Sequence, residues 1–472
     1  MTLLHHVDGQ PYGEAAQTGA IFNPATGERT GDVAFATTAE VAHAIEIATA
    51  AQKAWAETGL VRRADVFFRM RQLLVERQDE LGAIVTREHG KVLSDAKGEV
   101  SRGIENVEFA AGLTHLLKGE HSTGVAGGVD VHTIKAPVGV VACITPFNFP
   151  VMVPLWMSAS ALACGNAVIL KPSEKDPSAA NFIAALWEEA GLPKGLFNVI
   201  HGNKTAVDAL LEAPGIGAVS FVGSTPIARY IYETAAKNGK RVQALGGAKN
   251  HMIVMPDADL DSAADAAIGA AYGAAGERCM AISVLVAVGD ETADAVIAKV
   301  TERAAALRIG DGADTATDMG PLITREHRDR VASYVTGAQG EGAAVVMDGT
   351  TTRFDSDGFF LGASLIDNVK PGMKVYDDEI FGPVLSVVRA ASYDEAVAII
   401  NANPYANGTA IFTRDGGTAR AFRRTSKWAW WASTCLSRCR LARTRLAAGR
   451  TRSLAIPTSM GPSPSTSTRA PR

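Results

Sequence analysis

A cysteine with a cationic neighbour is the first candidate for chemistry in this 472-residue sequence. Cys279 stands in the segment AAGERCM, after small residues that let the backbone come close to a ligand. Arg278 precedes it, and a neighbouring guanidinium lowers the pKa of a thiol and favours the nucleophilic thiolate. The alternative is a buried structural cysteine, which is the commoner role of an isolated one.

An asparagine between two prolines is the second candidate. Asn148 lies in ITPFNFP, residues 144–150, directly after an apolar run. The prolines restrict the turn, so the Asn148 amide could donate a hydrogen bond to a developing oxyanion. An asparagine that only shapes the turn is the alternative.

Three further segments carry groups suited to a nucleotide. Lys171 and Glu174, in LKPSEKD, stand at the carboxyl edge of a predicted parallel sheet, where they could bind a ribose. The segment SFVGSTPIARYI predicts a strand, a turn and a helix start, so Ser224 could meet a phosphate. Glu379, in DDEIFGPVLSV, could bind a second ribose. Exposed loops and surface turns are the alternatives for all three.

The elements around these segments predict an α/β protein. Thr37 and Glu40 form a capping-box pattern ahead of a helix to about residue 57, and helical spacing continues at 60–87 and 92–117. Short apolar runs separated by helices follow, and they predict a parallel sheet of βαβ units. These runs are VGVVACITP, AVILKPSE, LFNVIHG, AVSFVGS and HMIVMPD.

A second α/β region begins near Gly246. It contains a predicted helix at 260–275, the run ISVLVAVGD and further alternation up to NGTAIFTRD at 407–415. The polar alternating segment at 128–139 predicts a strand or hairpin beside the two α/β lobes.

The composition is that of a globular protein of two or three domains. It is 47% hydrophobic and 20% charged with a net charge of −4, which favours neither disorder nor a nucleic-acid or membrane partner. The cysteines of the main body, Cys143, Cys164 and Cys279, lack the spacing of a metal site. No secretory segment follows Met1, so we expect a reducing, cytoplasmic location.

In this order and at these separations, the motifs resemble the aldehyde dehydrogenase superfamily over residues 20–425 or so. The resemblance implies two Rossmann-like parallel-sheet domains and a small oligomerisation hairpin, usually within a homotetramer. An NAD-binding domain would span 1–245, with the hairpin near 120–140, and a catalytic domain 246–425. The chemistry implied is attack of a cysteine on an aldehyde, hydride transfer to a nicotinamide and release of the acyl group from a thioester.

The resemblance also implies a role for each motif residue. Cys279 would be the nucleophile, and Asn148 with the Cys279 backbone N–H would form the oxyanion hole. The NAD-binding residues implied are Lys171, Glu174 and nearby Lys175 for the adenosine ribose, Thr145 and Phe147 along the dinucleotide, Ser224 at the pyrophosphate, Gly246 beside the nicotinamide and Glu379 at its ribose.

One departure from the family pattern indicates the branch. Hydrolytic members carry a general base in the segment Glu-Leu-Gly-Gly-Lys, whereas this chain has QALGGAKNH, which places Ala244 or Leu245 at the position of the glutamate. Without a base that contributes ~10²–10⁴ in rate, water would attack the thioester slowly and a thiol would be needed. Together with GERCM and TPFNFP, GAKNH resembles the CoA-acylating branch, the methylmalonate-semialdehyde dehydrogenases.

That branch implies NAD-dependent oxidation of methylmalonate or malonate semialdehyde, loss of the carboxyl group and transfer to CoA, giving propanoyl-CoA or acetyl-CoA. Arg278 and Arg102 are candidates to bind the substrate carboxylate, because a guanidinium binds a carboxylate bidentately. For Arg102, an ion pair with a glutamate of its own helix is the alternative. Two other functions stay open, a hydrolytic semialdehyde dehydrogenase with another base and an inactive relative. The pathway, in valine, inositol or β-alanine breakdown, also stays open.

The end of the sequence departs from the family. Residues 426–472 hold nine Lys or Arg and no acid, which leaves the first 425 residues at 37 minus 50, or −13. The segment WAWWA, residues 428–432, fixes much of its own coding sequence, because tryptophan has the single codon TGG. Read one base out of frame, that DNA encodes an apolar residue, glycine, an apolar residue, valine and glycine, the family's pattern at this point. A basic or disordered tail is the alternative.

We therefore predict a one-base frameshift near Ser426, in the gene or in its record. Sequencing the coding DNA across codons 420–430 should find a base gained or lost. An uninterrupted frame that matches the natural source would leave only the alternatives of a genuine basic or disordered tail. If the tail is real, the substrate pocket would lack a wall and the subunit contact would lack a strand. Activity and tetramer formation would then be in doubt.

Overall fold

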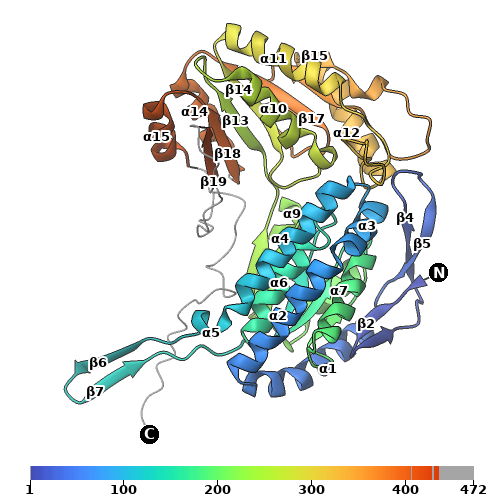
Figure 1. Ribbon diagram of the computed structural model, residues 1–472, viewed down its shortest axis with the longest axis vertical. Coiled ribbons are helices and arrows are strands. Elements are labelled where there is room, and N and C mark those ends of the chain that lie inside the picture. The colour runs from blue at the N-terminus through green and yellow to red at the C-terminus, as the bar shows by residue number, and fades with distance from the viewer. Residues whose placement is uncertain (1, 406, 428–429, 435–472) are drawn as a thin grey trace.

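The computed structural model describes residues 2–405, 407–427 and 430–434, the last five in their backbone only. Two seven-stranded sheets form the centres of two lobes (Figure 1). Each lobe has its own buried hydrophobic cluster, so each lobe has a separate core. The sheet changes between residues 245 and 250, where the sequence predicted the second α/β region to begin.

The first sheet has five neighbouring parallel strands, and two further strands are added antiparallel at one edge. In spatial order its strands are β12 (Arg241–Leu245), β11 (Ile216–Val222), β8 (Val140–Ile144), β9 (Ala167–Lys171), β10 (Phe197–Val199), β2 (His5–Val7) and β3 (Gln10–Tyr12). Its helices are α1 (Thr38–Glu57), α2 (Leu60–Glu76), α3 (Gln78–His89), α4 (Leu93–Ala111), α5 (Leu113–Leu116), α6 (Met152–Ala163), α7 (Ser178–Glu189), α8 (Lys204–Glu212) and α9 (Thr225–Lys237).

The second sheet is parallel except for its first strand. Its strands in order are β15 (Ala344–Met347), β16 (Ser364–Asp367), β17 (Val384–Ala390), β14 (Ile282–Val288), β13 (Asn250–Val254), β18 (Gly408–Phe412) and β19 (Trp430–Thr434). Its helices are α10 (Leu260–Ala271), α11 (Asp290–Ala305), α12 (Arg325–Ala338), α13 (Lys374–Asp377), α14 (Tyr393–Ala402) and α15 (Gly416–Thr425).

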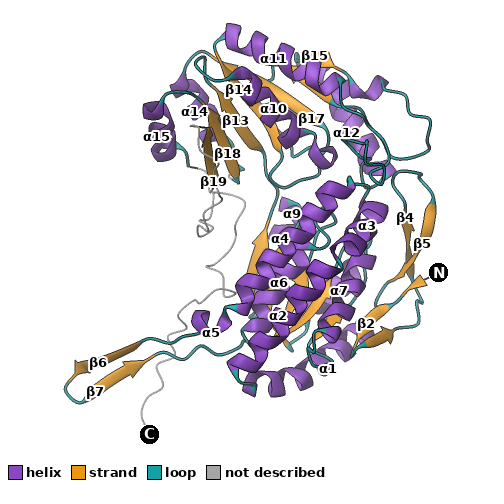
Figure 2. Ribbon diagram, in the orientation of Figure 1, coloured by secondary structure: helices purple, strands orange, loops and turns teal. Residues whose placement is uncertain are grey.

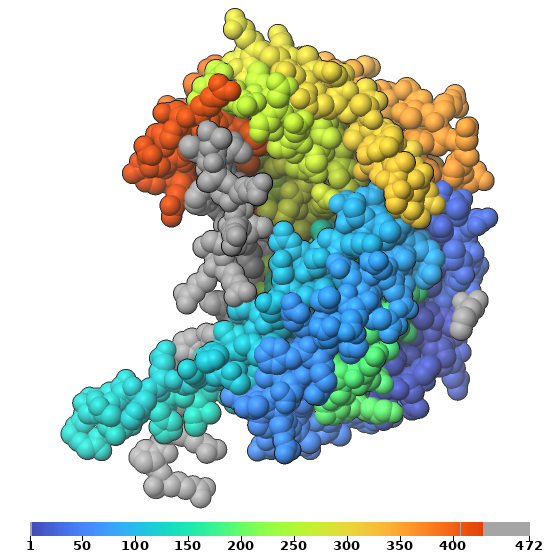
Figure 3. All heavy atoms as spheres, in the orientation of Figure 1, coloured from blue at the N-terminus to red at the C-terminus, as the bar shows by residue number. Residues whose placement is uncertain are grey.

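Two small sheets complete the described chain. One joins β1 (Thr2–Leu3), β5 (Arg29–Ala34) and β4 (Thr18–Phe22). The other is a hairpin of β6 (His121–Ala126) and β7 (Val129–His132), which stands clear of the body (Figure 3). The predicted hairpin is therefore present, whereas the short N-terminal strands were not predicted.

The predicted helices are present with shifted bounds. α1 begins with the expected capping box, in which Thr37 and Glu40 exchange hydrogen bonds. The stretch 60–87 is two helices because the backbone leaves helical geometry at Arg77, with φ −104° and ψ 17°. The stretch 92–117 likewise divides at Gly112. Of the aberrant tail predicted from Ser426, residues 428–429 and 435–472 lie outside the described residues, and 430–434 pair in parallel with β18.

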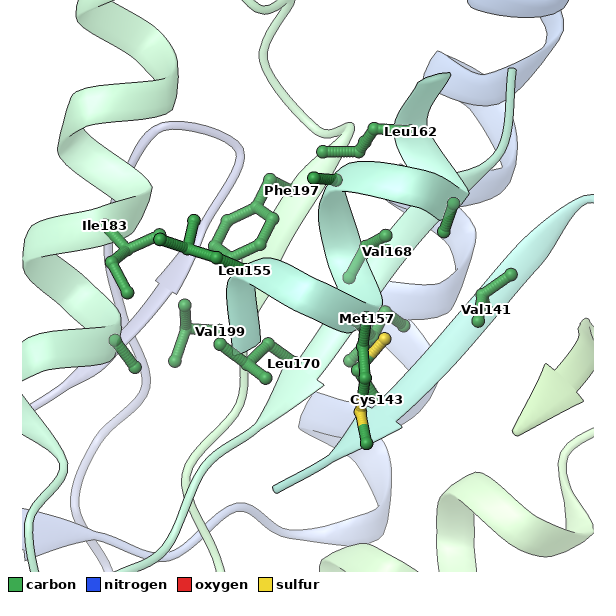
Figure 4. Packing of buried hydrophobic residues seen from close by; sticks show 14 of the residues in the cluster. Val141, Cys143, Leu155, Met157, Leu162, Val168, Leu170, Ile183, Phe197 and Val199 are labelled. Carbon is green, nitrogen blue, oxygen red and sulfur yellow. The ribbon is translucent and has the colours of Figure 1, made fainter. Parts of the chain in front are cut away.

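Close packing of α4 on α6 fixes the helical layer in front of the first sheet (Figure 2). Leu155 and Met157 of α6 lie among side chains of β8 and β9 in the core (Figure 4). Gly103 of α4 faces α6, and a Cβ built at this position would lie 2.6 Å from Leu155 Cδ1. The glycine therefore permits the approach of the two helices.

We predict opposite effects for two glycines of α4. Gly103→Ala should lower stability by about 1–3 kcal/mol, because its methyl group overpacks a fully buried leucine. Gly98→Ala, on the same helix with no atom within 4 Å of the added Cβ, should stabilise by about 0.5–1 kcal/mol through helix propensity. Thermal midpoints of the two variants measure the difference. Equal shifts would contradict close α4–α6 packing.

Candidate active site

The loop before Cys279 makes a left-handed turn. α10 ends at Ala271, and Ala274, Ala275 and Gly276 then take φ values of 49°, 52° and 73°. This is why the helix predicted to reach residue 275 ends early. Left-handed backbone costs a non-glycine residue about 1–3 kcal/mol, and such strain is found where a chain must present a group precisely to a site. The turn directs the chain back toward β14, with Cys279 just before that strand.

Two buried amides fix the backbone of the nucleophile loop. Asn250 Nδ2 and Asn407 Nδ2 donate to the Cys279 carbonyl at 3.0 and 2.9 Å. Asn250 also donates to the Ala281 carbonyl at 2.8 Å and accepts from Gly408 N–H at 2.9 Å. The sequence analysis missed both asparagines, although they stand in the motifs GAKNH and NGTAIFTRD.

The exposure of Cys279 suits a nucleophile. Its thiol is free and its residue is partly exposed. Cys143 is also free but fully buried in β8, where burial raises the pKa of its thiol. Cys279 is therefore the better placed of the two to meet a substrate.

The two candidate arginines line one face of α4. Arg278 Nη2 lies 2.5 Å from Asp95 Oδ2, in the first turn of that helix. Arg102 stands seven residues after Asp95, which is two turns along the same face. Arg102 lies 3.8 Å from Glu105 on its own helix, the ion pair that the sequence left as an alternative, and its side chain is 54% exposed.

The Asn148 loop follows β8 and is anchored by its backbone. Lys91 Nζ donates to the Asn148 carbonyl at 2.7 Å, and Asn148 is buried. Within the described part of the chain, the structure gives the Asn148 side chain no hydrogen bond. Its amide is therefore available for another acceptor.

The carboxyl edge of the first sheet holds the predicted ribose-binding pair. Lys171 ends β9, and its Nζ lies 3.3 Å from Glu174 Oε2. Burial alone would raise the pKa of Glu174, but the Lys171 charge, hydrogen bonds to the carboxylate and the Lys175 charge lower that pKa overall. An ionised carboxylate can accept from ribose hydroxyls. Lys175 Nζ lies 5.0 Å from the centre of the Phe147 ring.

A second set of predicted residues meets at the start of α9. Ser224 precedes α9, is exposed and makes no capping bond through its side chain. A Cβ on Gly246 would lie 2.9 Å from Thr225 Oγ1, so a side chain there would fill the space. Glu379 Oε1 accepts from Ala248 N–H at 2.7 Å, which brings its carboxylate beside this glycine turn.

These features fit a dinucleotide. The helix start can meet a pyrophosphate through its N–H groups. Thr145 Oγ1 is buried without a hydrogen-bond partner in the described chain, and so it can bond to a ligand. Lys171, Glu174 and Lys175 would hold one ribose and Glu379 the other.

A buried lysine that the sequence analysis missed supports Glu379. Lys249 Nζ donates to the carbonyls of Val375 and Asp378 at 2.8 and 2.7 Å. Burial lowers the pKa of Lys249 to about 7, against the opposing charge of Glu379. The two bonds hold the chain just before Glu379 and so set the direction of its side chain.

A buried carboxyl group lies at the boundary between the lobes. Glu277, two residues before the nucleophile, accepts from Ile323 N–H at 3.2 Å and lies 3.5 Å from His327 Nε2 and 3.8 Å from His89 Nε2. Burial raises the pKa of Glu277 to about 8. His327 donates to the Phe381 carbonyl at 2.7 Å. At neutral pH Glu277 is thus mainly protonated.

This proton makes stability depend on pH. The folded pKa of Glu277 lies above its ordinary 4.5, so between these values the folded protein retains a proton that the unfolded chain has lost. Stability from this group therefore falls as pH rises from about 4.5 to 8. Glu277→Gln keeps the acceptor for Ile323 N–H and removes the proton. Its free energy of unfolding relative to wild type should improve between pH 5 and 8, by up to about 1.4 kcal/mol per pH unit. A constant difference would contradict burial of a protonated carboxyl.

The fold and the arrangement of these residues fit a dinucleotide-dependent dehydrogenase. The sequence profile of the Aldehyde dehydrogenase family matches residues 12–429. The chain belongs to this family, and the predicted fold class and family are confirmed. The match ends close to Ser426, where we placed the change of reading frame. No helix in the described ranges is both long and apolar enough to cross a membrane.

Similar proteins agree on the branch. The malonate-semialdehyde dehydrogenase of Pseudomonas aeruginosa is 53% identical over 423 residues, 89% of this chain and 85% of the relative. A crystal structure of a putative methylmalonate-semialdehyde dehydrogenase from Sinorhizobium meliloti, complexed with NAD, has a TM-score of 0.94 and 50% identity, covering 97% of this chain and 94% of that one. The corresponding enzyme of Oceanimonas doudoroffii has a TM-score of 0.90 and 51% identity, covering 91% and 89%.

Proposed function

We propose that the protein oxidises malonate or methylmalonate semialdehyde with NAD and transfers the acyl group to CoA, with loss of the carboxyl group. Acetyl-CoA or propanoyl-CoA would be the product. The names of the similar proteins support the semialdehyde substrates and do not favour the alternatives. The observation that carries the CoA acceptor is the lack of a general base at the end of β12.

Neither register of β12 supplies that base, because the two positions hold Ala244 and Leu245. Ala244 points into the core and is fully buried, so a carboxylate there would have no solvent. Leu245, the next residue, is partly exposed and apolar. Glu277 is buried and mainly protonated, and Glu379 accepts from Ala248 N–H. Among these described groups, none is placed to activate water.

The residues of this chain account for each chemical step. The Cys279 thiolate forms a bond to the aldehyde carbon, and Asn148 with the Cys279 N–H stabilises the resulting oxyanion. NAD, held by Lys171, Glu174 and Glu379, would supply the acceptor for the hydride, and the acyl group would then remain on Cys279 as a thioester. The substrate carboxylate, which lies β to the thioester carbonyl, would leave as CO2, and the carbon it leaves would take up a proton. The CoA thiolate would then form a new thioester as the Cys279 thiolate leaves. Arg278 and Arg102 bind the substrate carboxylate, with Asp95 fixing the direction of Arg278.

NADH production from malonate semialdehyde, with and without CoA, tests the proposal. Turnover should require CoA and fall by at least about 10²-fold without it, since water lacks general-base help. Cys279→Ala should abolish turnover, whereas Cys164→Ala should retain it. Equal turnover without CoA would support the hydrolytic alternative. No turnover from a protein whose Cys279 still reacts with iodoacetamide would support an inactive relative.

The same assay tests the carboxylate site. Arg102→Leu should raise KM for malonate semialdehyde about tenfold or more while leaving propanal oxidation unchanged, because only the first substrate has a carboxylate. Arg71→Leu removes another partly exposed cation, from α2, and serves as the control. An unchanged KM would exclude Arg102.

We also expect a cytoplasmic location and, for a chain whose C-terminal segment is in frame, a homotetramer. All residues of β6 and β7 are exposed, including Val125, Val129 and Val131 at 47–53%. A two-stranded hairpin is marginal alone in water, so an exposed apolar hairpin suits a subunit contact. The free thiols of the described chain suit a reducing compartment. Sedimentation of the chain with its C-terminal segment in frame measures the oligomer, and a monomer would contradict this expectation.

A further inference from the structure

We propose that a buried ion pair, Lys91–Glu99, is a positioning device for the Asn148 amide. The inference rests on the proposed role of Asn148 as the oxyanion donor. Neither residue contacts the reacting atoms in this account, and both act through the loop that follows β8.

Lys91 anchors the loop at Asn148 itself. Lys91 is 2% exposed, and its Nζ donates to the Asn148 carbonyl and to Glu99 Oε2, each at 2.7 Å. The same Nζ lies 4.6 Å from the centre of the Phe149 ring. The ammonium group therefore contacts two successive residues of the loop, and a shift of Asn148 would break its hydrogen bond.

Glu99 anchors the far end of the loop with its second oxygen. Its Oε1 accepts from Val151 N–H at 2.7 Å and from Met152 N–H at 3.2 Å, at the start of α6. A carboxylate at a helix start also interacts favourably with the helix dipole. One ion pair thus holds the backbone on both sides of Phe149 and Pro150, through Lys91 of the α3–α4 connection and Glu99 of α4.

The pair is a poor device for stability alone. Removing two charges from water costs several kcal/mol each, and buried pairs can often be replaced by apolar residues without loss. Its geometry, however, suits placement of an amide, because a misplacement of about 1 Å at a catalytic group can cost ~10²-fold in rate.

The anchor also joins the loop to the other lobe. Leu93 N–H donates to the Gly312 carbonyl at 2.9 Å. A Cβ on Gly312 would lie 2.5 Å from the Lys91 carbonyl oxygen. The backbone of Lys91 thus contacts the lobe that carries Cys279, while its side chain holds Asn148. Lys91 therefore contacts both the loop of Asn148 and the lobe that carries Cys279.

A double-mutant cycle tests the proposal, with kcat for CoA-dependent NADH formation as the first readout. Asn148→Ala and Lys91→Met should each lower kcat by ~10²–10³-fold, the cost of an oxyanion donor. The double variant should be no slower than Asn148→Ala, because Lys91 acts through that amide. NAD binding and the rate of Cys279 alkylation should stay within about twofold. Lys97→Met, which removes the lysine of α4 paired with Asp79, is the control.

Additive losses in the double variant would overturn the proposal, because Lys91 would then act elsewhere. An unchanged kcat in Asn148→Ala alone would instead overturn the oxyanion role on which it rests. Hydrogen exchange of residues 145–152 is a second readout that needs no turnover. Lys91→Met and the milder Glu99→Gln should speed exchange of the Val151 and Met152 amides, and unchanged exchange in both would also overturn the proposal.

Discussion

One face of α4 sets the spacing of three charged groups. Asp95, Glu99 and Arg102 follow one another at intervals of four and three residues, so they form a single row along the helix. The first pairs with the arginine beside Cys279, the second holds the loop after β8, and the third extends toward solvent. Because one helix carries all three, their relative positions follow from helical geometry and not from loops. The Gly103 contact with α6 then fixes this helix on the first sheet.

At the boundary between the lobes, the site contains features that lower the stability of the fold. A left-handed turn at Ala274 and Ala275 and a fully buried Glu277 both oppose folding, and both lie within five residues of Cys279. They persist because the loop is held at its other end by Asn250 and Asn407, whose amides converge on one carbonyl. Strain and fixation therefore occur in the same loop, where the two amides hold the backbone of Cys279.

The sequence indicated the groups that we expect to meet ligands, but it did not indicate the groups that hold them in place. Asn148, Glu174 and Cys279 stand in short motifs whose chemistry can be recognised from neighbouring residues alone. The partners that orient them are distant in the chain: Lys91 contacts a carbonyl 57 residues away, and Asn407 one that is 128 residues away. Such contacts depend on how sheets and helices pack, which periodicity does not determine. The alternation of strands and helices did predict two α/β lobes. The predicted helix ends were wrong at the left-handed turn after Ala271 and where the chain leaves helical geometry at Arg77 and Gly112.

The lack of a general base and the presence of arginines have related electrostatic consequences. A carboxylate near the thioester would activate water, and it would also repel or compete with the carboxylate of a semialdehyde acid. Ala244 or Leu245 stands at that position, Glu277 is mainly protonated, and Arg278 forms an ion pair with Asp95. In the proposed reaction an anionic substrate would be attracted, while water at the thioester would have no strong acceptor for its proton. A thiolate needs none, since it attacks already deprotonated, so one arrangement favours both the acidic substrate and the thiol acceptor.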